Sequence, residues 1–104
     1  MRRVVVHSLD EARAALSQAG EVTIETPPGA AALHGIGWWR EILDILAEEF
    51  PGRTFTAILD CAGLPGLAMA AIRDGIPAIR FAGTAAVTEK IAALAEAAGV
   101  RLVR

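Results

Sequence analysis

The chain has 104 residues, of which 54% are apolar, a net charge of −2 and one cysteine, Cys61. This length supports one hydrophobic core, and a single cysteine excludes an internal disulfide or a cysteine-based zinc cluster. The charged residues form no basic stripe, so no nucleic-acid partner is expected. The longest apolar runs are far shorter than the roughly 20 residues that span a bilayer, and residues 1–7 lack a signal-peptide core. We therefore expect a cytoplasmic protein with no membrane partner.

Strand patterns and helix patterns alternate along residues 1–104. The strand patterns cover residues 3–7, 21–26, 54–60, 77–82 and 100–103, and the helix patterns cover residues 8–19, 36–50, 64–74 and 84–98. Ser8 and Glu11 form a predicted capping box, and Thr84 is a predicted N-cap. The alternation of five strands with four helices predicts a single α/β domain with a mostly parallel sheet.

The strand order is predicted from which strands have an apolar side chain at nearly every position. Residues 3–7, 54–60 and 77–82 read as strands covered on both faces, whereas residues 21–26 and 100–103 alternate and read as edges. This favours the order 2-1-3-4-5 of a three-layer, flavodoxin-like fold. A consecutive order, as in a half-barrel or a STAS-like arrangement, is the alternative, and it would place Val4–Val6 at an edge and Glu25 inside the sheet.

In the favoured order the connectivity reverses between the first and third strands, and a ligand site is expected beyond their carboxyl ends. The loops at 61–66 and 82–84 lead into helix N-termini, where free N–H groups can hold a small anion. They match neither a dinucleotide nor a P-loop fingerprint, so no cofactor is expected. The candidate ligand site comprises His7, Ser8, Asp60, Cys61, Arg80 and Thr84.

Each chemical role in this predicted site competes with a structural one. Asp60 is a candidate general base, cation ligand or phosphate acceptor, or else a helix cap or ion-pair partner of Arg80. Cys61 is either a thiol activated by the following helix or a small core residue. His7 is either an acid–base group or a solvated strand end. His34 has no second ligand at metal-binding spacing, so no metal site is predicted.

The apolar surface of the helix at 36–50 is wide for a helix that covers one sheet. Its central stripe carries Trp39, Leu43, Leu46 and Phe50, and Trp38 and Ile45 lie beside that stripe. Such extra surface meets either another subunit or the preceding segment, residues 30–37. The sequence leaves both open, and Trp38 and Ile45 are the candidate interface of a homodimer or a protein complex.

The order of elements, with Asp60 ending the third strand and Thr84 following the fourth, resembles a phosphoacceptor receiver domain. That resemblance implies a phosphorylated aspartate at Asp60 and a switch hydroxyl at Thr84. The first strand ends in Val6-His7-Ser8 where receivers carry paired acidic residues for magnesium, and no lysine ends the fifth strand. Residues 55–103 are similar in layout to STAS domains, with Cys61–Gly66 in place of their phosphorylatable segment.

No complete set of catalytic groups accompanies these candidates. We therefore expect a non-catalytic binding or regulatory module that acts through protein–protein contacts, as a homodimer. The alternative is a minimal enzyme or ligand-binding protein for a small anionic metabolite held between His7, Asp60, Cys61 and Arg80.

Overall fold

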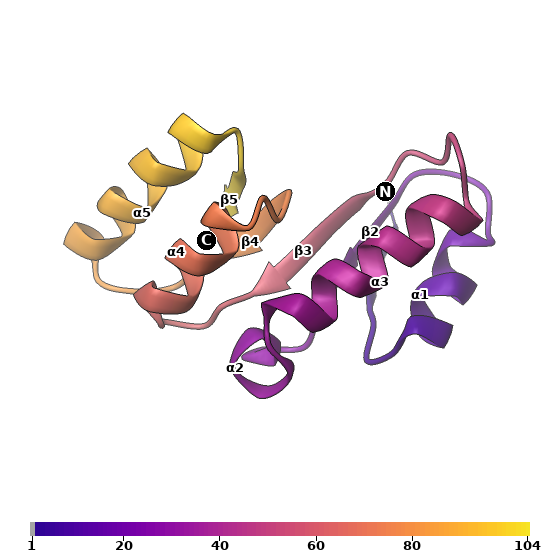
Figure 1. Ribbon diagram of the computed structural model, residues 1–104, viewed down its shortest axis with the longest axis horizontal. Coiled ribbons are helices and arrows are strands. Elements are labelled where there is room, and N and C mark those ends of the chain that lie inside the picture. The colour runs from indigo at the N-terminus through magenta and orange to yellow at the C-terminus, as the bar shows by residue number, and fades with distance from the viewer. Residues whose placement is uncertain (1) are drawn as a thin grey trace.

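Five parallel strands alternate with helices in the computed structural model, which describes residues 2–104 (Figure 1). The strands are β1 (Arg2–Val5), β2 (Val22–Glu25), β3 (Thr56–Asp60), β4 (Ala78–Arg80) and β5 (Arg101–Val103). The helices are α1 (Leu9–Leu16), α2 (Ala30–His34), α3 (Ile36–Glu49), α4 (Pro65–Arg73) and α5 (Ala85–Ala98). The predicted single α/β domain is confirmed, with one additional short helix, α2, in the segment before α3.

The sheet order is β1-β2-β3-β4-β5, with every neighbouring pair parallel. The predicted order 2-1-3-4-5 is therefore wrong, and the consecutive alternative is correct. The prediction required Val4–Val6 to be covered on both faces, but Val5 is 48% exposed on an edge strand. It also kept Glu25 out of the sheet interior, where its carboxylate is in fact held by Arg3 and Arg80. The resemblance to receiver domains does not extend to the sheet topology, because receivers have the doubly wound strand order and this sheet has the consecutive order.

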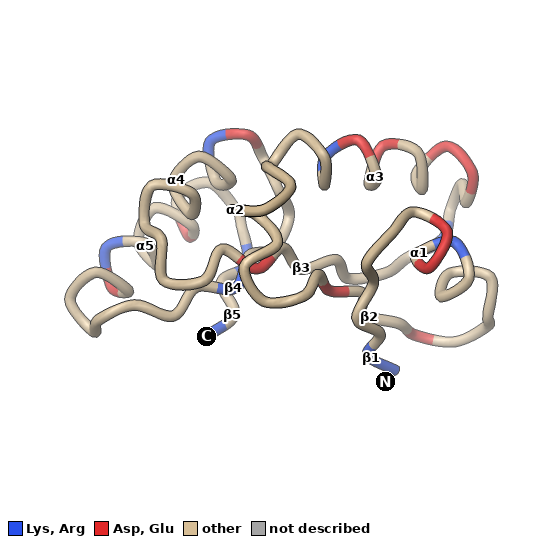
Figure 2. The backbone as a smooth tube through the Cα atoms, turned by 90° about the horizontal axis from the view of Figure 1, so that it is seen from below, with Lys and Arg blue, Asp and Glu red and all other residues tan. Residues whose placement is uncertain are grey.

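The helices cover one face of the sheet. Consecutive parallel neighbours joined by right-handed crossovers place their helices on the same side, and Figure 2 shows α1, α3, α4 and α5 on one side of the strands and both chain termini on the other. The hydrophobic core contains Ile24, Leu59 and Ile79, which point toward this helix layer. The predicted three-layer arrangement is therefore wrong, and the domain has two layers.

The opposite face, here called the open face, carries the alternate residues of each strand. These residues are Arg3, Val5, Thr23, Glu25, Thr56, Ile58, Asp60, Ala78, Arg80, Arg101 and Val103. Ile58 and Ala78 are buried here although they lie outside the main core. No helix in residues 2–104 is long and apolar enough to cross a membrane.

Local signals in the sequence fix where two of the helices begin. The Ser8 Oγ accepts a hydrogen bond from the Glu11 N–H at 3.2 Å, and the Thr84 Oγ1 accepts one from the Val87 N–H at 3.4 Å, as predicted. The return bond of the capping box differs, because the Glu11 carboxylate accepts from the N–H of His7 at 3.0 Å. The caps are therefore satisfied by side chains within one helical turn.

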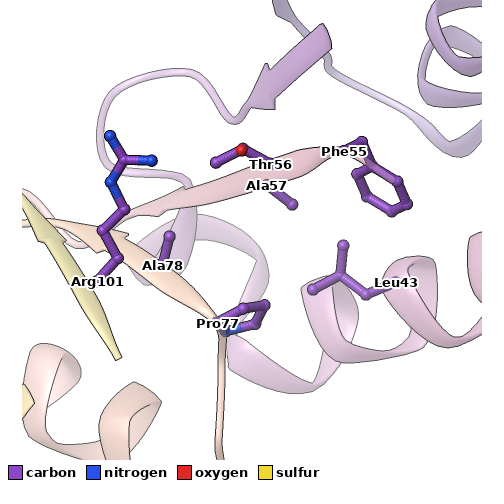
Figure 3. A pocket seen from close by; sticks show the side chains of 7 residues that line it. All are labelled: Leu43, Phe55, Thr56, Ala57, Pro77, Ala78 and Arg101. Carbon is purple, nitrogen blue, oxygen red and sulfur yellow. The ribbon is translucent and has the colours of Figure 1, made fainter. Parts of the chain in front are cut away.

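The strand β3 divides its pairing between its two neighbours. Its residues Thr56–Ile58 pair with β2, whereas Leu59 and Asp60 pair with β4. The first half of β3 therefore has a paired strand on one side, and the strands β3 and β4 diverge toward their amino-terminal ends, as Figure 3 shows. This split is the main irregularity of the sheet.

Candidate functional site

The predicted crevice between the ends of β1 and β3 does not form, because β2 lies between these strands. Two strand spacings separate their backbones by about 10 Å, and the connectivity does not reverse. The His7 Nδ1 lies 3.1 Å from the Glu11 Oε1 on the exposed surface, and Ser8 caps α1. The structure therefore places His7 and Ser8 in a local helix cap, apart from Asp60.

Asp60 is buried and joins two loops. Its Oδ1 accepts hydrogen bonds from the backbone N–H groups of Gly29 at 3.0 Å and Ala62 at 2.8 Å, and its own N–H donates to the Thr26 Oγ1 at 2.9 Å. Its Oδ2 lies 3.9 Å from the Nε of Arg80. These contacts fix the loop that precedes α2 against the turn that precedes α4, which is a structural role for the carboxylate.

Glu25 lies at the centre of a charged network that sequence reasoning missed. Its Oε1 lies 2.8 Å from Arg3 Nη2 and its Oε2 lies 2.9 Å from Arg80 Nη2, so one carboxylate links β1 with β4 across the open face. Arg80 also donates to the backbone oxygen of Arg104 at 3.2 Å. Burial opposes ionisation of Glu25, but the hydrogen bonds from Arg80 and Arg3 prevail and lower its pKa. The sequence does place Arg3, Glu25 and Arg80 in three different strands. This pattern indicates a charged network only when the consecutive strand order is known.

Cys61 and Thr84 complete the predicted set. The Cys61 side chain is fully buried, and this burial, with the nearby charge of Asp60, raises the pKa of its thiol to about 11. Thr84 is used as the N-cap of α5. Arg80 approaches Asp60, but its shorter contact is with Glu25.

Two clefts occupy the amino-terminal half of the open face and share Thr56 and Arg101. The first, of about 170 Å³, is lined by Arg3, Thr23, Thr56, Ile58, Arg101 and Val103. The second, of about 300 Å³, enters the split between β3 and β4 and is lined by the residues labelled in Figure 3: Leu43, Phe55, Thr56, Ala57, Pro77, Ala78 and Arg101. Among the described residues, no acidic side chain lines either cleft.

Arg101 is the charged side chain common to both clefts. Its backbone N–H donates to the Pro77 oxygen at 3.0 Å, which holds the start of β5 against β4. Its guanidinium is exposed, and within residues 2–104 it has no hydrogen-bond or ion-pair partner. By contrast, Arg3 and Arg80 are both tied to Glu25. Arg101 is therefore the guanidinium of the open face with all of its donors unused.

An apolar groove lies on the helix layer, between α4 and α5. It measures about 430 Å³ and is lined by Met69, Ile72, Arg73, Leu94, Ala97 and Ala98. Met69 and Leu94 are each 44% exposed. This groove is larger than either cleft of the open face. It was not predicted from the sequence.

The predicted interface residues are half-buried. Trp38 stacks on the ring of His34 with centroids 4.5 Å apart and contacts Trp39 at 5.8 Å, so the segment before α3 folds back over it. Trp38 packs against the core, and Ile45 is half-buried on the same helix. The sequence left open whether this wide apolar surface meets another subunit or the preceding segment. The preceding segment covers one face of the Trp38 ring, through His34.

Residues 2–104 contain no group of three His, Cys, Asp or Glu side chains placed to hold a metal ion. The chain matches no protein-family model, and no curated protein is detectably similar to it in sequence.

The buried thiol generates a first prediction. Cys61 in the folded protein should react with a disulfide reagent at pH 8 at least about 100-fold more slowly than in urea, because a pKa near 11 leaves little thiolate and burial blocks access. The rate is followed by the absorbance of the released thiol. A folded-state rate within tenfold of the unfolded rate would show instead that Cys61 is accessible.

The charged network generates a second prediction. Replacing Glu25 with Gln should lower the free energy of unfolding at pH 7 by about 1–3 kcal/mol, because two arginines lose their shared anion. Since folding lowers the pKa of Glu25, its carboxylate stabilises the protein above its unfolded pKa, and this stabilisation disappears as pH falls through the folded pKa.

Urea unfolding of both proteins at pH 7 and pH 3 measures this difference, which should be smaller at pH 3 than at pH 7. Glu21→Gln, at an exposed position before β2, is the matched control and should have little effect. An equal loss for both variants would contradict the role of the network.

Proposed function

We propose that this chain is a non-catalytic binding module that holds a small anion on the open face of its sheet, with Arg101 as the principal ligand. The observation that carries the proposal is that the Arg101 guanidinium, which has no partner among residues 2–104, lines both clefts of that face. Guanidinium groups present several N–H donors in a planar fork that matches carboxylate and phosphate oxygens.

Within residues 2–104 no helix layer covers the open face, and this supports a binding role for it. Parallel sheets are usually covered on both faces, whereas here one face is without a helix layer (Figure 2). The face combines aliphatic side chains with threonine hydroxyls and arginines, and this mixture can bury part of a ligand and orient the rest.

The charge of the open face favours an anion over a second copy of the same face. Three arginines, Arg3, Arg80 and Arg101, stand against two carboxylates, Glu25 and Asp60. Both carboxylates are already engaged within the chain. Two such faces pressed together would oppose like charges, which disfavours that pairing.

The engagement of the other candidate groups supports binding without catalysis. Asp60 is held by backbone N–H groups, Ser8 and Thr84 cap helices, and the raised pKa of Cys61 keeps its thiol protonated near neutral pH. A free nucleophile beside a free base is what acid–base or covalent catalysis needs. A cytoplasmic location is part of the proposal, since a lone reduced thiol suits a reducing compartment.

The role of Arg101 can be tested by titrating ¹⁵N-labelled protein with sodium phosphate and with sodium acetate at constant ionic strength. We expect amide shifts at Thr56, Arg101 and Val103, with loss of at least about tenfold in affinity in Arg101→Gln, because the charge-assisted bonds are removed.

Arg73→Gln is the matched control, because Arg73 is also exposed and unpaired within residues 2–104 but lies in the α4–α5 groove. It should bind as the wild type does. Equal binding by Arg101→Gln and wild type, or no saturable shift with either anion, would contradict the proposal.

A second candidate function, a protein–protein contact that forms a homodimer, is favoured by the α4–α5 groove. Met69 and Leu94 leave apolar surface beside the small side chains of Ala97 and Ala98. Small residues let helices approach closely, and a two-fold axis would set the same patch of each copy against the other. This contact is compatible with a ligand on the open face, because it lies on the helix layer.

Sedimentation equilibrium tests the homodimer. We expect the wild type to dimerise at high concentration and Leu94→Lys to be monomeric, because an ammonium group beside Arg73 would be desolvated in a groove that has no acidic side chain among the described residues that line it. Ala93→Lys adds the same charge at an exposed neighbouring position outside the groove and should still dimerise. A monomeric wild type would rule out this candidate.

A further inference from the structure

We infer that the anion is amphipathic, a monocarboxylate whose carboxylate binds Arg101 and Thr56 and whose aryl or branched alkyl group fills the split between β3 and β4. This inference rests on the proposed function and specifies the ligand class for the same site.

The split is a space that the sheet itself leaves empty. The pairing of β3 with β4 begins at Leu59 and Ile79, so Thr56 and Ala57 of β3 have β2 on one side and the cleft on the other. Pro77, at the opposite wall, has no N–H to donate across the gap. The cleft therefore separates two strands that elsewhere in the sheet would be joined by hydrogen bonds.

The walls of the split are apolar at one end. Leu43 comes from α3, Phe55 precedes β3, and Pro77 precedes β4, so three separate segments contribute carbon surface. Leu43 and Phe55 are half-buried and already pack against the core. A ring or branched chain placed here would be removed from water on several sides, which stabilises its binding in proportion to the apolar area covered.

The other end of the split is polar. Figure 3 shows the Arg101 guanidinium and the Thr56 hydroxyl on the same side of the cleft, with Leu43 and Pro77 on the opposite side. The guanidinium can donate two parallel hydrogen bonds to a carboxylate, and the hydroxyl can donate a third. A cleft with one charged end and one apolar end is complementary to an amphipathic monocarboxylate.

The size and the lining narrow the choice of ligand. A volume of about 300 Å³ is at the lower end of small-molecule sites. A dicarboxylate would place its second charge against Leu43, Phe55 and Pro77, which offer no side-chain hydrogen bond and would disfavour it. Inorganic phosphate would use the polar end and leave the apolar end filled with water.

Isothermal titration calorimetry with three matched compounds tests the inference. Phenylacetate carries both features, acetate has the charge alone, and phenylethanol has the ring without the charge. We expect phenylacetate to bind at least about tenfold more tightly than either of the others, because it uses both ends of the cleft. Leu43→Ala should weaken phenylacetate about fivefold and leave acetate unchanged, since it removes carbon surface at the apolar end alone.

Leu94→Ala is the matched control, because it shortens an equally large side chain in the other groove and should leave phenylacetate binding unchanged. Amide shifts at Ala57 and Ala78 on adding phenylacetate to the wild type give a second measurement that needs no variant. Their presence supports occupation of the split, and their absence contradicts it.

The outcomes separate the two proposals. Equal affinities for acetate and phenylacetate, both lost in Arg101→Gln, would overturn the amphipathic ligand and leave the anion-binding function standing. Equal affinities for phenylacetate and phenylethanol, unchanged in Arg101→Gln, would overturn both. Absence of saturable binding by all three compounds would also overturn both.

Discussion

Glu25 is the carboxylate on which the open face of this sheet depends. A parallel sheet with helices on one side must expose its other side to water, and the inner strand β2 would otherwise present an unpaired charge there. Arg3 and Arg80 reach Glu25 from β1 and β4, so a single anion ties strands on both sides of β3. The cost of burying the carboxylate is offset because both of its oxygens have cationic partners. Arg101, which lies beyond this network, is then left without a carboxylate and is open to a ligand.

Local chemistry in the sequence was sufficient to place the elements approximately, except for the short helix α2. Ser8 and Thr84 predicted the starts of α1 and α5 correctly because a cap depends on residues within one turn. The strand order was not predictable in the same way. The burial of a valine depends on what lies against it, and Val5 is exposed on an edge although its neighbours in sequence are apolar. The prediction kept Glu25 out of the sheet interior because Arg3 and Arg80, which pair with its carboxylate, are both distant from it in the sequence.

The candidate site was predicted at the carboxyl ends of the strands, whereas the clefts lie toward their amino-terminal ends. This difference also arises from contacts between residues that are distant in the sequence. Asp60 was the strongest signal in the sequence, and the structure assigns it to loop organisation. Cys61, for which the sequence offered an activated thiol or a core residue, lies in the core. The clefts lie instead where Thr56 and Arg101 meet, and neither residue stands out by type or by spacing. What brings them together is the register of three strands, which no short motif encodes.

The divided pairing of β3 also has a mechanical consequence. The wing formed by β1 and β2 pairs with the first half of this five-residue strand, and the wing formed by β4 and β5 pairs with its second half. The Glu25–Arg80 ion pair and the hydrogen bond from the Asp60 N–H to the Thr26 Oγ1 also connect the two sides near the carboxyl ends of the strands. The strands β3 and β4 are therefore held together at their carboxyl ends and separated at their amino-terminal ends, where pairing begins only at Leu59. A change in the twist of β3 would act on the width of the gap at that amino-terminal end.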